Sequence, residues 1–156
     1  MICAVLSPAG PQRSRVLAIL YKSDRTRELV DLYAMLTKVY LDRVLSSEEV
    51  ALFTEHLSEH HRSTLADGST VLGRAVLEHN LLSVSRLYDY IRVDELARLL
   101  NTTETHAEGA AARMMGEGRI RGSIDQVARL IAFERMPIGE QAREAAHAEV
   151  VKAQLE

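Results

Sequence analysis

The spacing of the apolar residues constrains this fold more than any other feature of the sequence. After Pro11 the apolar residues recur at the three- and four-residue spacing of amphipathic helices, in one segment after another. Only the stretch from Arg119 to Phe133 changes to a strand-like pattern, with polar and apolar residues alternating and then a second apolar run. The sequence therefore predicts a mainly α-helical protein that has one small sheet near its end.

The first half of the chain predicts a series of helices. One helix is expected from Asp31 to Leu45, and Ser46 with Glu49 has the spacing of a capping box that opens the next helix. A long helical pattern follows from Val71 to Leu87. The period alone does not decide whether this pattern is one helix or two helices broken near Asn80.

The second half of the chain predicts a winged helix. Tyr90-Ile91 is a short β-prone stretch, and a short helix follows with Leu96, Leu99 and Leu100 inward. Another helix is expected from about Thr103 to Met115, before a hairpin of 119–124 and 130–133. Helix, strand, helix, helix and hairpin is the element order of a winged helix.

We expect three regions along the chain: a helical part at 1–79, the winged helix at 80–135, and a helical tail at 136–156. Pro137 is well placed to start the tail helix. Its apolar stripe is thin and rich in alanine: Ile138, Ala145, Ala148 and Leu155.

Composition excludes several classes of protein. The chain has 156 residues and a net charge of -3, whereas general binding to nucleic acid or membranes needs a basic surface. Its one cysteine, Cys3, excludes an internal disulfide and a cysteine-rich zinc site. The start lacks the basic region of a signal peptide, and no apolar run approaches the ~18 residues of a membrane span. We expect a soluble protein of a reducing compartment.

Two motifs resemble catalytic or cofactor sites. His56, Glu59 and His60 have the spacing of a zinc-binding H-x-x-E-H motif on one helical face, but no third ligand is evident, and a solvated polar face is favoured. The segment 68–75 has the glycine spacing of a P-loop without its lysine or its Ser/Thr. No catalytic, metal or cofactor site is predicted.

A winged helix also raises the hypothesis of DNA binding. Its recognition helix would carry Glu104, His106 and Glu108, with only Arg113 as a cation. Such a helix is poorly suited to the major groove of a polyanion, although Arg119 and Arg121 on the wing would allow a weak phosphate contact. The charges favour a different role.

The stretch from Leu72 to Glu134 resembles a PCI domain, the module shared by the proteasome lid, the COP-nine signalosome and a translation-initiation factor complex. The resemblance rests on segments 78–82, 85–88 and 95–100, and on Gly118-Arg119-Ile120, Gly122, Ile124-Asp125 and Phe133-Glu134. Upstream, segments 9–15, 40–43 and 66–69 make the chain similar to the subunit 4 family of the signalosome, over about residues 3–135.

This resemblance implies a non-catalytic scaffold. It implies the end of a right-handed helical-repeat arm followed by a winged helix, in a complex that removes the ubiquitin-like modifier from cullins (deneddylation) and so regulates cullin-RING ubiquitin ligases. The implied location is the cytoplasm and nucleus. The first alternative is a proteasome-lid PCI scaffold, and the less favoured one is a winged-helix nucleic-acid-binding module.

The partners implied are other PCI subunits, with no specific nucleic acid, membrane or small-molecule substrate. PCI winged helices associate edge to edge, and an edge strand offers unpaired backbone groups to a partner strand. Ile120 and Ile124 are expected to face the core, and Arg121 and Ser123 the solvent; a proline at either outward position would then test the edge. The predicted edge residues are Tyr90, Ile91, Arg119, Ile120, Arg121, Gly122, Ser123 and Ile124, and the tail residues Ile138, Ala145, Ala148 and Leu155 are predicted to join a helical bundle.

Overall fold

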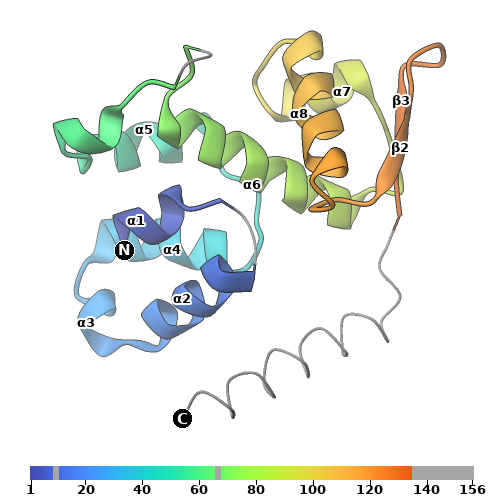
Figure 1. The fold of residues 1–156 in the computed structure, drawn as a ribbon. Helices are drawn as coiled ribbons and strands as arrows, with labels where there is room; N and C mark the ends of the chain where they lie inside the picture. Colours follow the sequence, from blue (N-terminus) through green and yellow to red (C-terminus); the bar gives the residue numbers. More distant parts are fainter. Residues whose placement is uncertain (9–10, 66–67, 135–156) are drawn as a thin grey trace.

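The computed structural model describes residues 1–8, 11–65 and 68–134. Figure 1 shows the helix α6 running between a group of helices that includes α1 to α4 and a second group formed by α7, α8 and the strands. The helices are α1 (Ile2–Leu6), α2 (Pro11–Lys22), α3 (Asp24–Arg27), α4 (Val30–Tyr40), α5 (Ser47–Glu55), the 3-10 helix η1 (Glu59–Arg62), α6 (Val71–Leu87), α7 (Val93–Leu99) and α8 (Glu104–Gly116). The strands are β1 (Tyr90–Arg92), β2 (Gly122–Asp125) and β3 (Leu130–Phe133). The prediction of a mainly helical fold with a winged helix is confirmed.

Helices α1, α2, α4 and α5 enclose the first hydrophobic core. Its largest fully buried side chains include Leu36 and Val39 of α4, packed with Val5 of α1. Leu72, near the start of α6, closes this core from the other side. The rings of Tyr21, Tyr33 and Tyr40 stack beside it, with centroids of Tyr21 and Tyr40 4.6 Å apart. The amphipathic pattern of this half is therefore satisfied by helix-on-helix packing.

Helix α4 ends at Tyr40, so the expected extension of this helix to Leu45 is wrong. Asp42 takes a positive φ of 52°, and the Arg43 amide donates back to the Lys38 carbonyl at 2.9 Å. This is the Schellman arrangement, which turns the chain away from the helix axis. The next residues are extended, and the capping box at Ser46 and Glu49, which is confirmed, then opens α5.

Helix α6 is one continuous helix, which answers the question that the period left open at Asn80. Thr70 caps its start by accepting a hydrogen bond from the Gly73 amide at 2.9 Å. The helix contributes Leu72 to the first core and Leu77, Leu81 and Val84 to the second. The predicted boundary at 79 and 80 lies inside this shared helix.

The second core lies within the winged helix. It joins α6, α7, α8 and the sheet through side chains such as Leu96, Met114 and Ile131, which are fully buried. Among the described residues the sheet has the order β1-β3-β2, and both pairs are antiparallel. Leu99 was expected to point inward, but it is 39% exposed, because α7 ends there and Leu96 and Leu100 fill the core instead.

Strand β2 begins at Gly122, three residues later than expected from the alternation that starts at Arg119. Gly118 has a φ of 70°, and the Arg119 amide donates to the Met114 carbonyl at 2.9 Å. The first residues of the predicted strand therefore complete the C-terminal cap of α8. At the other end of β2, Asp125 accepts hydrogen bonds from the Val127 and Ala128 amides and so shapes the hairpin turn.

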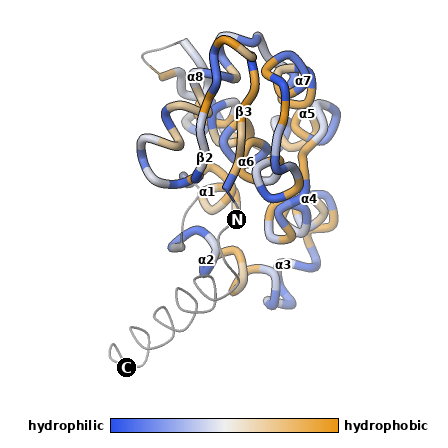
Figure 2. Tube along the Cα trace, turned by 90° about the vertical axis from the view of Figure 1, so that its right-hand side faces the viewer, coloured by the Kyte–Doolittle hydropathy of each residue, from blue (hydrophilic) through white to orange (hydrophobic). Residues whose placement is uncertain are grey.

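The described helices differ from membrane spans. Figure 2 shows hydrophobic and hydrophilic residues mixed along the tube. In the part of the chain that the structure describes, no helix has the length and apolar character that crossing a membrane requires.

The two cores are joined by polar side chains in the middle of α6. The Asn80 side chain accepts a hydrogen bond from the Leu45 amide at 2.8 Å and donates one to the Leu45 carbonyl at 3.0 Å. Next to it, the His79 Nε2 donates to the Arg43 carbonyl at 2.8 Å. Both side chains are buried. Asn80 therefore holds the segment before α5 against α6.

Replacing Asn80 by Ala is expected to lower the free energy of unfolding by about 2–4 kcal/mol, because the buried Leu45 amide and carbonyl would both lose their partner. Chemical denaturation measures this change. Ser85→Ala is the matched control on the same helix, since its hydroxyl bonds only the Leu82 carbonyl one turn away. An Asn80→Ala protein as stable as the control would contradict this role.

The stability of the fold is expected to fall when the pH drops below about 6.5. Burial and, to a smaller extent, the charge of Arg13 lower the pKa of His79 from 6.5 to about 4, against the opposing effect of its bond to Arg43. The unfolded chain therefore takes up a proton at a higher pH than the folded chain. Between pH 6.5 and 4 this would remove about 3 kcal/mol, measured by denaturation at a series of pH values.

The variant His79→Gln, which keeps a neutral donor, is expected to flatten this part of the stability profile. The exposed His106 provides the control, and His106→Gln should leave the profile unchanged. An unchanged slope in His79→Gln would show that another group titrates in this range.

Candidate interaction site

The register of the sheet determines which backbone groups are left for a partner. The Glu134 amide donates to the Arg121 carbonyl at 2.9 Å, and the Phe133 amide donates to the Asp89 carbonyl at 2.8 Å. In an antiparallel pair the directly hydrogen-bonded positions alternate. On β2, Ser123 and Asp125 therefore point their backbone groups at β3, while Gly122 and Ile124 point theirs away from the sheet.

The β2 edge offers the longer run of outward backbone groups. Gly122 and Ile124 each present an amide and a carbonyl there, and within the described residues no backbone hydrogen bond from outside the sheet reaches them. Gly122 has a steric role, because a Cβ at this position would overlap the Ala132 carbonyl oxygen. This edge can accept a partner strand without any change in the sheet.

The β1 edge is shorter. By the same register, Ile91 bonds β3 and Tyr90 points its backbone groups outward. Arg92 is already the N-cap of α7, so its carbonyl belongs to the helix. Tyr90 is 67% exposed, and Leu87 and Tyr88 are exposed next to it in the sequence. The β1 edge is therefore a short pairing site with an apolar border.

The structure places the predicted edge residues in different surroundings. Ile120 is buried, Ile124 packs on the second core, and Arg121 and Ser123 are exposed, as expected. The expected proline test needs correction, because the Ser123 amide faces β3. The outward amides belong to Gly122 and Ile124, so Ile124 is the position at which a proline tests this edge.

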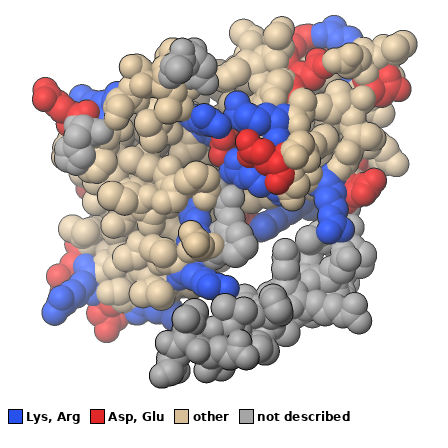
Figure 3. All heavy atoms as spheres, in the orientation of Figure 1, with Lys and Arg blue, Asp and Glu red and all other residues tan. Residues whose placement is uncertain are grey.

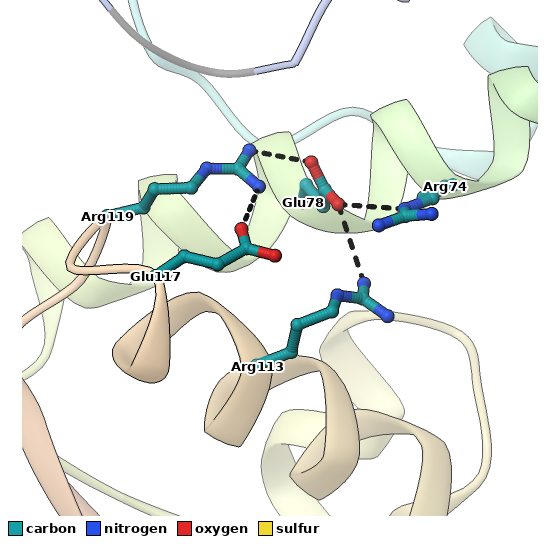
Figure 4. A network of polar contacts seen from close by, with 5 residues as sticks. All are labelled: Arg74, Glu78, Arg113, Glu117 and Arg119. Carbon is teal, nitrogen blue, oxygen red and sulfur yellow. Dashed lines mark hydrogen bonds and ion pairs between the residues drawn. The ribbon is translucent and has the colours of Figure 1, made fainter.

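Arg119 also differs from its expected place. It precedes β2 and lies in a network of charged side chains around Glu78, shown in Figure 4. Its guanidinium contacts the Glu78 carboxylate at 2.6 Å and the Glu117 carboxylate at 3.0 Å. Arg74 and Arg113 reach the other oxygen of Glu78 at 3.1 and 3.4 Å. The network ties α6 to α8 and to the start of the wing.

Glu78 is held in its charged form by these arginines. Its side chain is only 5% exposed, and this burial by itself would raise the pKa of Glu78. The hydrogen bonds from Arg119 and Arg74, together with their charges, outweigh burial and lower the pKa below its ordinary value. Glu78 is therefore ionised at neutral pH and fixes the orientation of the arginines.

The substitution Glu78→Gln is expected to lower the free energy of unfolding by about 2–4 kcal/mol, because a buried carboxylate would be lost from between its cations. The difference should shrink as the pH falls through the pKa of Glu78, since the wild-type carboxylate is then protonated as well. Thermal and chemical unfolding measure both effects. Glu117→Gln, at a more exposed partner of Arg119, is the control and should cost far less.

The histidine motif does not form the helical face that its spacing predicted. Helix α5 ends at Glu55, and His56 is its C-cap. Glu59 begins the separate 3-10 helix η1. The described residues hold no group of three or more histidine, cysteine or acidic side chains placed to bind a metal ion.

The P-loop-like segment has a structural explanation. Gly68 occupies a turn with a φ of 80°, and Thr70 and Gly73 belong to the start of α6. The sequence pattern therefore reports a turn followed by a helix cap.

Helix α8, the counterpart of a recognition helix, presents little that could read bases. Thr105, Gly109 and Ala112 lie on its exposed side. Glu104 pairs with Arg129, and Glu108 accepts a hydrogen bond from Gln126 at 2.7 Å. These two carboxylates of α8 are therefore bound to the hairpin. The predicted tail residues Ile138, Ala145, Ala148 and Leu155 lie outside the described residues.

Sequence reasoning missed the polar network of α6. In the sequence, Glu78, His79 and Asn80 belong to the segment 78–82 that carries the family resemblance, which assigns them no partner. A signal was present, because three consecutive polar residues interrupt an otherwise amphipathic helix and so include positions that face the interior. Apart from Arg74 on the same helix, the partners named above lie 35 to 41 residues away, which no local pattern indicates.

Comparison with known proteins agrees with this geometry. The PCI domain family matches residues 54–135. The chain is 51% identical over 136 residues to "COP9 signalosome complex subunit 4" of Dictyostelium discoideum, covering 87% of this chain and 34% of that relative. The protein of the same name from Arabidopsis thaliana is 53% identical over 132 residues, covering 85% and 33%. The chain spans about a third of the length of the curated relatives it matches. With its winged helix, its open sheet edges and this match over more than half its length, the chain belongs to the PCI domain family.

Proposed function

We propose that this chain is the PCI portion of a signalosome subunit 4 and acts as a non-catalytic scaffold. Its partners are other PCI subunits of the same complex, which join it by strand pairing at the sheet edges and by bundling of the C-terminal tail. Through that assembly it serves the removal of the ubiquitin-like modifier from cullins, in the cytoplasm and nucleus. The location follows from the resemblance alone and stays a prediction.

The open β2 edge is the observation that carries this proposal. Gly122 and Ile124 direct backbone donors and acceptors away from the sheet. Unpaired strand edges are a template for another chain, and proteins usually cover or blunt them. Here the edge belongs to a PCI domain, and its relatives from Dictyostelium discoideum and Arabidopsis thaliana carry the name of a complex subunit, which supports a partner strand as the occupant.

The two rival functions receive less support. A proteasome-lid subunit would use the same edges, but the relatives reported above carry the signalosome name. Nucleic-acid binding is disfavoured because the acidic residues of α8 are tied to the hairpin and the chain has a net charge of -3.

A pair of substitutions at Ile124 tests the β2 edge. Ile124→Ala and Ile124→Pro both remove the isoleucine side chain, but only proline also removes the backbone N–H that points away from the sheet. We expect Ile124→Ala to co-purify with the other PCI subunits and Ile124→Pro to be lost from the complex. The measurement is a pull-down of those subunits, with a thermal melt to show that both variants fold.

The same comparison at Tyr90 tests the β1 edge, with Tyr90→Ala as the matched control for Tyr90→Pro. Tyr90 is mostly exposed, so neither change removes core packing. If both folded proline variants assembled like their alanine controls, strand pairing would be wrong as the mode of association.

A further inference from the structure

A groove of about 790 Å³ lies where the helical part meets the winged helix. One wall is the start of α5 with Ser47 and Val50, and the other is the turn after α7 with Leu99 and Asn101. The first half of α6 is the floor. The side chains of Asn101 and Ser47 are hydrogen-bonded at 3.0 Å, which joins the two walls at one point.

The charge of the groove has one sign. Its charged lining residues are Arg74, Arg98 and Arg113, and among the described residues that line it there is no aspartate or glutamate. Arg74 and Arg113 share one oxygen of Glu78, whose other oxygen binds Arg119. Glu117 is a second carboxylate partner of Arg119, so three guanidinium groups face two carboxylates and the network keeps a net positive charge. Figure 3 shows acidic side chains among the basic side chains that gather in the middle of the face, between the two parts of the molecule.

The arginines also retain hydrogen-bonding capacity. Arg74 reaches Glu78 through its Nε, so its terminal nitrogens are not used in that bond. The Arg98 side chain is 76% exposed, and its contact with Asp94 at 3.2 Å is a surface ion pair. Such pairs contribute little free energy, so Arg98 can leave Asp94 for another carboxylate at little cost. A second anion would satisfy these donors.

Apolar side chains alternate with these cations along the groove. Val44 and Val50 lie on the side of α5, and Leu99, left exposed by the end of α7, lies on the other side. Isolated phosphate or sulfate would leave these surfaces uncovered. An extended peptide carries carboxylates and apolar side chains in turn, and its backbone can bond to polar groups such as Thr102.

From this geometry we propose that the groove binds an acidic, leucine-containing segment of a partner protein. The carboxylates bind Arg74, Arg98 and Arg113, and the leucines pack on Val50 and Leu99. The net charge of -3 opposes a nucleic acid as the occupant, because the rest of the surface would repel a long polyanion. No residue of β1 or β2 lines the groove, so this binding is independent of strand pairing at the sheet edges.

The test uses the whole chain and a short fluorescein-labelled peptide in which glutamate and leucine alternate. The control peptide has glutamine in place of glutamate. Fluorescence anisotropy is expected to show at least about tenfold tighter binding of the acidic peptide, as for charge-assisted bonds to arginine. Equal affinity for the two peptides would overturn the charge complementarity on which the proposal rests.

Matched variants locate the binding. Arg98→Ala and Leu99→Glu should each weaken binding of the acidic peptide about three- to tenfold. Arg27→Ala and Leu52→Glu make the same changes at exposed positions outside the groove and should leave the affinity unchanged. Thermal melts establish that all four variants are folded. If the outside variants weakened binding as much as the groove variants, or if single-stranded RNA displaced the peptide with higher affinity, the proposal would be wrong.

Discussion

The hydrogen bonds between Asn80 and the backbone of Leu45 are the constraint on which the rest of the structure depends. They are buried, they use both the amide and the carbonyl of Leu45, and they connect segments 35 residues apart. A buried backbone segment must have its polar groups paired, and here one side chain provides both partners. This contact fixes the segment before α5 against the middle of α6, and so sets the junction between the two cores.

Glu78 and His79 extend the same junction in two directions. His79 binds the backbone of the helical part, and Glu78 binds arginines of α8 and the wing. Leu77, Leu81 and Val84 pack α6 into the core of the winged helix, but hydrophobic burial by itself has no directional preference. Charged and neutral hydrogen bonds have a required geometry, so they fix the orientation of the sheet and of its open edges. The strand pairing that we propose therefore depends on polar side chains that are not part of the sheet edges.

Much of the fold could be predicted from local patterns, and the parts that could not have physical reasons. The capping box at Ser46 and the order of the winged helix are local or periodic signals, and both are confirmed. The end of α4 was missed because Asp42, rather than a glycine, takes the left-handed conformation. The start of β2 was placed too early because Arg119 and Ile120 alternate like a strand while their amides cap α8. The Glu78 contacts were missed because residues far apart in the sequence meet only in the fold.

The exposure of Leu99 shows that the way in which helix α7 ends shapes the surface of the protein as well as its core. Asn101 has a positive φ of 50°, and the Thr102 amide donates back to the Ala97 carbonyl at 3.0 Å, which turns the chain sharply after α7. This turn directs Leu96 and Leu100 inward and leaves Leu99 beside the arginines that Glu78 holds. The groove and the sheet edges are thus made by different elements. Both are positioned by α6, because its Leu77 and Asn80 line the groove and its Leu81 and Val84 pack in the core beneath the sheet.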